Sequence, residues 1–213
     1  MPPSASVRLV FDVDGTLLRS TTLDAELYAR AFREIYGVAL PTTDWARYRH
    51  ATDRGIAEEA VALVGGDATA IPRLRERFVA LLSEVARIDE MPGAGALVAA
   101  LRAARIPFAI ATGGWQAAAR AKLRAGGIDV ADAPLIGSDD HVARHAIVRA
   151  AIDRIDGDGP ALYVGDGPWD RQACERLAIG FIAVGEDARA LSTRWVRDFR
   201  DRDAFLDLCR IEI

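Results

Sequence analysis

Lysine is almost missing from this sequence, because only one of its 27 basic residues, Lys122, is a lysine. Any catalytic task that proteins usually give to lysine is therefore expected to fall to arginine, or to be absent. Cysteine is scarce as well. Cys174 and Cys209 form no C-x-x-C pair, which favours reduced, structural thiols over a disulfide framework. The histidines form no metal-ligand spacing with these cysteines, so nothing here predicts a zinc site.

Other absences limit the partners that this chain can have. No run reaches the roughly 18 consecutive apolar residues that a membrane-spanning helix needs. No long apolar stretch lies ahead of Asp12, so we expect no signal peptide. The formal net charge of −4 does not favour nucleic acid, whose phosphate backbone calls for a basic face. We therefore expect a cytoplasmic protein with neither a membrane nor a nucleic-acid partner.

Apolar residues make up 51% of the chain, enough for a substantial core, and many of them fall into five short runs. Each run is apolar along its length, as is typical of a parallel strand that is covered on both faces. Segments with helical periodicity alternate with the later runs. This alternation predicts an α/β fold with a doubly wound, Rossmann-like parallel sheet. The expected strands are residues 7–11, 106–112, 133–138, 161–166 and 179–185, and the expected helices between the later strands are 95–106, 115–128, 145–155 and 170–179.

The interval between the first two expected strands does not fit this rhythm. From about residue 19 to residue 87 the pattern is helical throughout, with glycine and proline separating three segments. A crossover connection needs only about a dozen residues. We therefore expect residues 1–18 and 88–213 to form the α/β core and residues 19–87 to form an inserted helical cap. The alternative is a helical layer that packs flat on the sheet.

Polar residues gather where the expected strands end, and this is the edge at which an open parallel sheet binds its ligands. Carboxylates that meet there would repel one another, and a divalent cation that prefers oxygen ligands, Mg²⁺, would relieve the repulsion. Glycine-bearing turns add main-chain N–H groups that suit a phosphate. Together these features predict phosphoryl chemistry. The residues at this edge are Asp12, Asp14 and Thr16, then Thr112, Gly113 and Gly114, then Ser138, Asp139, Asp140 and Arg144, and finally Asp166 and Asp170.

These residues make the sequence resemble the haloacid dehalogenase-like hydrolase superfamily. The segment Asp12-Val13-Asp14-Gly15-Thr16 follows an apolar strand and matches the first family motif, D-x-D-G-T. Thr112 matches the second motif, a lone Ser or Thr. Gly165-Asp166 together with Asp170 matches the fourth, G-D-x-x-x-D. The helical insert resembles the cap of the phosphoglycolate phosphatase and β-phosphoglucomutase branch of this family.

The third motif departs from the family pattern. The family has a lysine ahead of the helix that precedes the fourth strand, whereas the matching stretch here, DDHVARHAIVRAAI, contains none. Arg144 is the best substitute. It would keep a positive charge beside Asp12, although its planar guanidinium is larger than an ammonium group and binds phosphate differently. The other interpretation is that Arg144 is a surface residue.

The resemblance implies a role for each carboxylate. Asp12 is the nucleophile, and Asp14 is the general acid and then the general base. Mg²⁺ is held by the carboxylates of Asp12 and Asp166 and by the main-chain carbonyl of Asp14, while Asp170 orients this shell from behind.

The remaining site residues would bind the phosphoryl group. Thr112 and main-chain N–H groups near it, including that of Gly113, would bind its oxygens, and Arg144 would neutralise it during transfer. Each assignment has a plainer alternative. The two motif aspartates could form a turn, Thr112 and Asp166 could cap helices, and Asp170 could be a solvated helix residue.

Substrate selection is expected on the insert. The stretch RYRHATDRGIAEE contains a Thr52-Asp53 helix start and two arginines. By resemblance to the family, Arg54, and next to it Arg49, would bind a distal anionic group such as a carboxylate or a second phosphate. The alternative is a capped helix whose arginines face the solvent.

The function we expect is a Mg²⁺-dependent phosphatase that acts on a small phosphorylated metabolite. A phosphomutase of the same family would use the same residues. Because the family lysine is missing, a weakened enzyme that serves as a phosphate-ligand binding or regulatory protein is the alternative from another class.

Overall fold

One parallel sheet forms the centre of the computed structural model, which describes residues 7–130 and 133–211. Residues 1–6, part of the stretch in which we expect no signal peptide, lie outside the described residues. The sheet has six strands in the order β3-β2-β1-β4-β5-β6, and neighbouring strands are parallel throughout. The doubly wound α/β fold that the sequence predicts is therefore confirmed. The strands are β1 (Arg8–Phe11), β2 (Phe108–Ala111), β3 (Leu135–Ile136), β4 (Ala161–Gly165), β5 (Gly180–Val184) and β6 (Trp195–Val196).

Helices cover both faces of the sheet, because its strands are apolar on both sides. The α-helices in the described residues are α1 (Thr21–Tyr36), α2 (Asp53–Leu63), α3 (Ile71–Ser83), α4 (Ala94–Ala103), α5 (Gln116–Ala125), α6 (Arg144–Ile152), α7 (Pro168–Leu177) and α8 (Arg202–Cys209). Leu9 and Phe11 of β1 pack in a core with α4, α5 and α8, whereas Val10 between them packs in a second core with α6 and α7.

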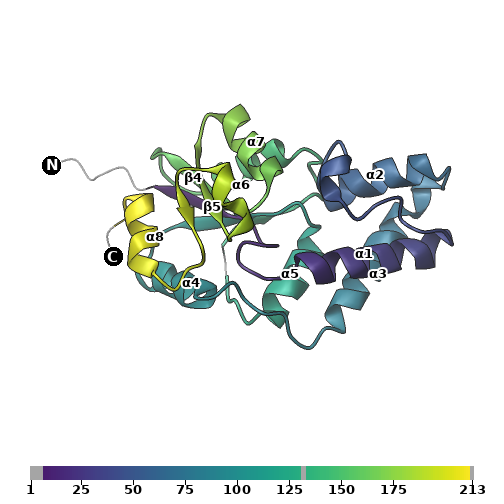
Figure 1. Cartoon of the computed structure of the whole chain (residues 1–213), viewed down its shortest axis with the longest axis horizontal. Coiled ribbons are helices and arrows are strands. Elements are labelled where there is room, and N and C mark those ends of the chain that lie inside the picture. The colour runs from purple at the N-terminus through teal and green to yellow at the C-terminus, as the bar shows by residue number, and fades with distance from the viewer. Residues whose placement is uncertain (1–6, 131–132, 212–213) are drawn as a thin grey trace.

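The helices α1, α2 and α3, called the insert helices below, form a third apolar cluster. They group at one end of the molecule, away from α4 and α8 (Figure 1). Their cluster includes Tyr28 and Phe78 and extends to Trp115 and Ala118 at the start of α5. Tyr28 stacks on Trp115 with ring centroids 5.8 Å apart. Residues 19–87 are thus helical, as expected, and one face of α5 supports them. Their division from the rest of the chain as a separate cap domain stays a prediction.

The order of the strands places the site. The sheet is built outward in both directions from β1, so that β2 lies on one side of β1 and β4 on the other. Ligands of doubly wound sheets bind where the strand order reverses, beyond the carboxyl ends of the strands. Asp12 follows β1 directly and Asp166 follows β4 directly, so both lie at this point.

The chain after β5 closes the fold. A short strand, β6, pairs with β5, and α8 then packs Phe205 and Leu206 into the main core. Cys174 and Cys209 are both buried free thiols, as the sequence predicts. Within the described ranges, we find no helix that combines the length and the apolar character needed to cross a membrane.

Candidate active site

The loop that follows β1 brings two carboxylates to one cavity. The main-chain N–H of Asp12 donates to the carbonyl of Val164 at 2.9 Å, so sheet pairing continues for one residue beyond β1. The chain then turns at Gly15, whose φ of 78° lies in the left-handed region. A Cβ on Gly15 would lie 1.9 Å from Oδ2 of Asp166, so a larger residue would displace the carboxylate of Asp166. This turn lets Asp12 and Asp14 line the same cavity, although alternate residues of an ideal strand face opposite ways.

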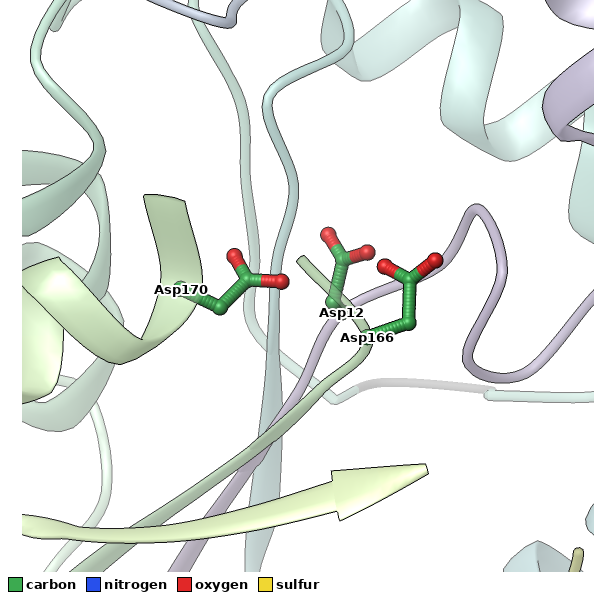
Figure 2. Close-up of side chains that lie close together, drawn as sticks. All are labelled: Asp12, Asp166 and Asp170. Atoms are coloured by element: carbon green, nitrogen blue, oxygen red, sulfur yellow. The ribbon is translucent and has the colours of Figure 1, made fainter. Parts of the chain in front are cut away.

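Three aspartates form an acidic cluster at the carboxyl ends of β1 and β4. One carboxylate oxygen from each of Asp12, Asp166 and Asp170 lies within 4.8 Å of the others (Figure 2). Asp170, in the first turn of α7, is fully buried. Its carboxylate accepts hydrogen bonds from the Gly167 N–H at 3.0 Å and from the Tyr163 hydroxyl at 3.2 Å. These bonds fix the carboxylate of Asp170 behind the other two.

The acidic cluster fits a divalent cation. Burial and, next, the neighbouring Asp170 raise the pKa of Asp166 to about 8, and burial raises the pKa of Asp12 as well. The charged forms of these carboxylates are therefore disfavoured when only protein groups surround them. Clustered carboxylate oxygens are the ligands that Mg²⁺ prefers, and a bound cation would stabilise their charged forms.

Arg144 is the cation that lines the cavity among the described residues. Its Nη1 lies 3.0 Å from Oδ1 of Asp12, and its Nε lies 3.5 Å from Oδ1 of Asp170. Its Nη2 donates to the carbonyl of Ala51 at 3.3 Å. The guanidinium is thus largely buried beside Asp12, the candidate nucleophile, and is not a surface group. Arg144, Asp12, Asp166 and Asp170 are called the Arg144 cluster below.

The turn after β2 lies directly against this cluster. Thr112 is buried and lines the cavity, and its Oγ1 accepts from the Gly114 N–H at 3.1 Å. A Cβ on Gly113 would lie 2.6 Å from Nη2 of Arg144 and 2.8 Å from the carbonyl oxygen of Ala51. The main chain at Gly113 therefore approaches the guanidinium more closely than any larger residue would allow.

The lone lysine, to which the sequence analysis assigns no role, lies beside Asp14. Nζ of Lys122 is 2.5 Å from Oδ2 of Asp14 and 2.6 Å from Oδ1 of Asp24, and its side chain is 0% exposed. The Ser20 hydroxyl donates to the other Asp14 oxygen at 2.5 Å. These four residues are called the Lys122 cluster below. Although burial favours the neutral amine, Asp14 and Asp24 raise the pKa of Lys122, so it remains charged. Burial raises the pKa of Asp24 to about 6.

A signal for Lys122 was present in the sequence. Trp115, Ala118 and Lys122 recur at helical spacing, and all three are buried on one face of the segment that forms α5. A lysine on an apolar helix face must find opposite charges, because an unpaired buried ammonium group is very costly. The spacing identifies the buried face, but the sequence does not reveal which carboxylates meet it.

Asp53, which the sequence predicts only as part of a helix start, also belongs to the site. Thr52 does cap α2, since its Oγ1 accepts from the Gly55 N–H at 3.2 Å. The Asp53 carboxylate, however, accepts from the Trp115 N–H at 2.9 Å, and its own N–H donates to the Gly113 carbonyl at 2.8 Å. Asp53 lines the cavity and joins α2 to the turn after β2.

The two arginines expected to bind substrate lie outside the cavity. Arg54 pairs with Glu58 at 2.8 Å and donates to the carbonyl of Asp139 at 3.0 Å. Arg49 is exposed, and neither arginine is part of the cavity wall. Successive helix residues point about 100° apart, so α2 presents Asp53 to the cavity and turns Arg54 away from it.

The fold and the site define an enzyme of the doubly wound α/β class, with carboxylates at the switch point of the sheet. The sequence model of the family described as haloacid dehalogenase-like hydrolase matches residues 8–177, and the chain belongs to this family of hydrolases. A comparison with curated protein sequences gives no significant match.

Solved structures share the fold. A hydrolase from Pseudomonas syringae has 23% sequence identity and a TM-score of 0.73, over 96% of this chain and 98% of that one. CbbY from Rhodobacter sphaeroides, in complex with phosphate, has 21% identity and a TM-score of 0.72, over 96% and 99% of the two chains. A mutant of CbbY in complex with xylulose-1,5-bisphosphate has 21% identity and a TM-score of 0.69, over 90% and 94%.

Proposed function

We propose that this hydrolase is a Mg²⁺-dependent phosphatase that acts on a small phosphorylated metabolite through an aspartyl-phosphate intermediate. The observation that supports this most is the position of Asp12. Its carboxylate is buried at the carboxyl end of β1, 3.0 Å from Arg144, and lines the same cavity as Asp14. A carboxylate nucleophile, an adjacent cation and a second carboxylate for proton transfer are the groups that covalent phosphoryl transfer needs.

In the first step, a carboxylate oxygen of Asp12 attacks phosphorus while the bond to the leaving oxygen breaks, and Asp14 gives that oxygen a proton. In the second step, Asp14 takes a proton from water, which attacks the phosphorus of the aspartyl-phosphate. Inorganic phosphate leaves, and Asp12 is restored. Arg144 and the turn at Thr112 would bind the phosphoryl oxygens in both steps, and Lys122 would hold Asp14 in place.

The Mg²⁺ ion would be held by the carboxylates of Asp12 and Asp166 and by the main-chain carbonyl of Asp14, with Asp170 in support. When bound, it would offset the negative charge of the phosphoryl oxygens that approach Asp12. We also propose that residues 19–87 act as a cap over the leaving-group end of the cavity. The cavity wall supports this, because Asp24 and Asp53 of the insert helices contribute to it.

Hydrolysis of p-nitrophenyl phosphate, with Mg²⁺ and with EDTA, tests this proposal. We expect Mg²⁺-dependent release of phosphate and a loss on the order of 10³-fold or more in Asp12→Asn, because the nucleophile is removed. Asp140→Asn is the matched control, since Asp140 is an exposed carboxylate near the same edge of the sheet. Activity that survives Asp12→Asn would rule out the nucleophile assignment. Isomerised product in place of free phosphate, on a panel of sugar phosphates, would assign a phosphomutase instead.

A further inference from the structure

The cavity has two chemically different ends. The end at the sheet is formed by Asp12, Thr112, Arg144 and their neighbours, and it is where the phosphoryl group would be bound. The insert helices and their connections form the rest of the wall, called the leaving-group end below, which adjoins the sheet end where Ala51 contacts Arg144 and Asp53 contacts Gly113. The residues that this part of the chain contributes to the wall are Thr21, Asp24, Trp45, Ala51, Thr52, Asp53 and Ile56.

As far as the chain is described, the leaving-group end presents hydrogen-bond acceptors and no cation. Among the described residues that form this end, the ionisable ones are Asp24 and Asp53, both acidic. Lys122 is their nearest counter-charge, but its side chain is 0% exposed and its amine bridges Asp14 and Asp24. Lys122 therefore stabilises these carboxylates from the protein interior and does not contact a ligand in the cavity.

The nearby arginines do not supply a cation to the leaving-group end. Arg144 lines the cavity but is committed to Asp12 at the phosphoryl end. Arg54, which follows Asp53 in α2, pairs with Glu58 and with the carbonyl of Asp139 outside the wall. A second anionic group on a substrate would thus face carboxylates without a cation to receive it, which is unfavourable because like charges repel.

The same wall suits a hydrogen-bond donor. The carboxylates of Asp24 and Asp53 can accept bonds from a hydroxyl or an ammonium group. Trp45 adds an aromatic face that suits either an apolar carbon chain or a cation. The cavity volume of about 80 Å³ fits a short leaving group better than a long one.

We propose that the site takes phosphate monoesters of short alcohols whose leaving group donates hydrogen bonds and carries no negative charge, and that it discriminates against esters with a second anionic group. This proposal rests on the phosphatase function proposed above. It sets the chain apart from CbbY, whose mutant has been crystallised with a bisphosphate, and from enzymes that act on phosphoglycolate.

Three two-carbon esters of matched size test the proposal: phosphoglycolate, 2-hydroxyethyl phosphate and phosphoethanolamine. Their distal groups are a carboxylate, a hydroxyl and an ammonium group. We expect kcat/KM for phosphoglycolate to be lower than for either of the others by about tenfold or more, because only its distal group is repelled by the wall. The inhibition constant of each ester against p-nitrophenyl phosphate gives the same ranking, even for an ester that turns over slowly.

Two variants locate the effect. Asp53→Asn and Asp24→Asn each replace one carboxyl group of the wall with an amide of nearly the same shape, and each should reduce the discrimination against phosphoglycolate. Glu76→Gln is the control, because Glu76 is an exposed carboxylate of α3 outside the cavity wall, and it should leave the ratio unchanged.

The two proposals can fail separately. If p-nitrophenyl phosphate is hydrolysed in an Asp12-dependent way but phosphoglycolate is bound as well as, or better than, the other esters, the substrate class is wrong and the phosphatase stands. If no Asp12-dependent hydrolysis occurs, the phosphatase function itself is wrong.

Discussion

The two cations at this site organise carboxylates in opposite ways. In the Arg144 cluster, one guanidinium contacts Asp12 and Asp170 but not Asp166, and burial together with mutual repulsion raises the pKa of Asp12 and Asp166. In the Lys122 cluster, one ammonium group contacts two aspartates at 2.5 and 2.6 Å, and the Ser20 hydroxyl donates to one of them. The first cluster still needs positive charge, as a metal and phosphate site must. In the second cluster, the positive and negative charges are closer to balanced, and their contacts hold these side chains in place.

Of the changes that compare the two clusters, the largest effect should come from removing the cation of the Arg144 cluster. Arg144→Ala removes the charge beside Asp12, and we expect kcat/KM for p-nitrophenyl phosphate to fall by on the order of 10² to 10³, as when other transition-state donors are removed. Arg144→Lys restores the charge and should recover part of the loss. Arg149→Ala, an exposed arginine on the same helix, is the control. Activity of Arg144→Ala within threefold of the parent would show that this arginine is dispensable.

Breaking the Lys122 cluster should affect stability and one kind of substrate. Lys122→Met keeps the length of the side chain but leaves Asp14 and Asp24 facing each other, which should cost about 3–5 kcal/mol in the free energy of unfolding, measured with urea. Because Asp14 then loses its position, hydrolysis of alkyl phosphates should fall more than that of p-nitrophenyl phosphate, whose leaving group needs no proton.

A purely structural role for Lys122 would predict something else. Stability would fall, but activity on the two kinds of ester would fall in equal proportion at a temperature where the variant is folded. Leu123→Ala provides the reference for this outcome, because Leu123 is a buried apolar neighbour on α5 that packs in the main core. Arg120→Gln, an exposed change on the same helix, should alter neither quantity.

Magnesium should distinguish the clusters without any substrate. Ligand binding to the folded state alone stabilises it by about 2.7 kcal/mol at a concentration a hundred times Kd. We therefore expect Mg²⁺ to raise the melting temperature of the parent and of Asp24→Asn, but not that of Asp166→Asn. An equal rise in all three proteins would place the ion outside the Arg144 cluster.

The smallest effect should be that of Arg54→Ala, which touches neither cluster. Arg54 does not line the cavity and its ion pair with Glu58 is exposed, so we expect kcat and KM for any ester to change less than about twofold and stability by less than about 1 kcal/mol. A large rise in KM for an anionic ester would restore the specificity role that the sequence suggested for Arg54.

The fold could be predicted from the sequence because its signals are local. Apolar runs predicted the longer strands of the doubly wound sheet, and the D-x-D-G-T segment marked the end of β1. Two strands were less visible. β3 spans Leu135–Ile136 alone, and β6 spans Trp195–Val196. A strand of two residues is too short to show a recognisable apolar pattern in the sequence.

The candidate site was predicted in part, for a similar reason. Asp12, Asp14, Thr112, Arg144 and Asp166 lie on one wall, because strand ends meet at a common edge. Lys122 and Asp53 were missed because their roles depend on tertiary contacts between helices, which no local pattern specifies. Arg54 was selected for its charge, but α2 directs the preceding residue, Asp53, toward the cavity and directs Arg54 away from it.

The burial of Lys122 has a practical consequence for anyone who handles this protein. Since it is the sole lysine and its side chain is inaccessible, the folded surface offers no ε-amine to acylating reagents or amine cross-linkers. Reaction at that amine would report unfolding or local opening. In a sample labelled with ¹⁵N at lysine Nζ only, a single nitrogen resonance would arise, and it would come from the contact between α5, the loop after β1 and α1.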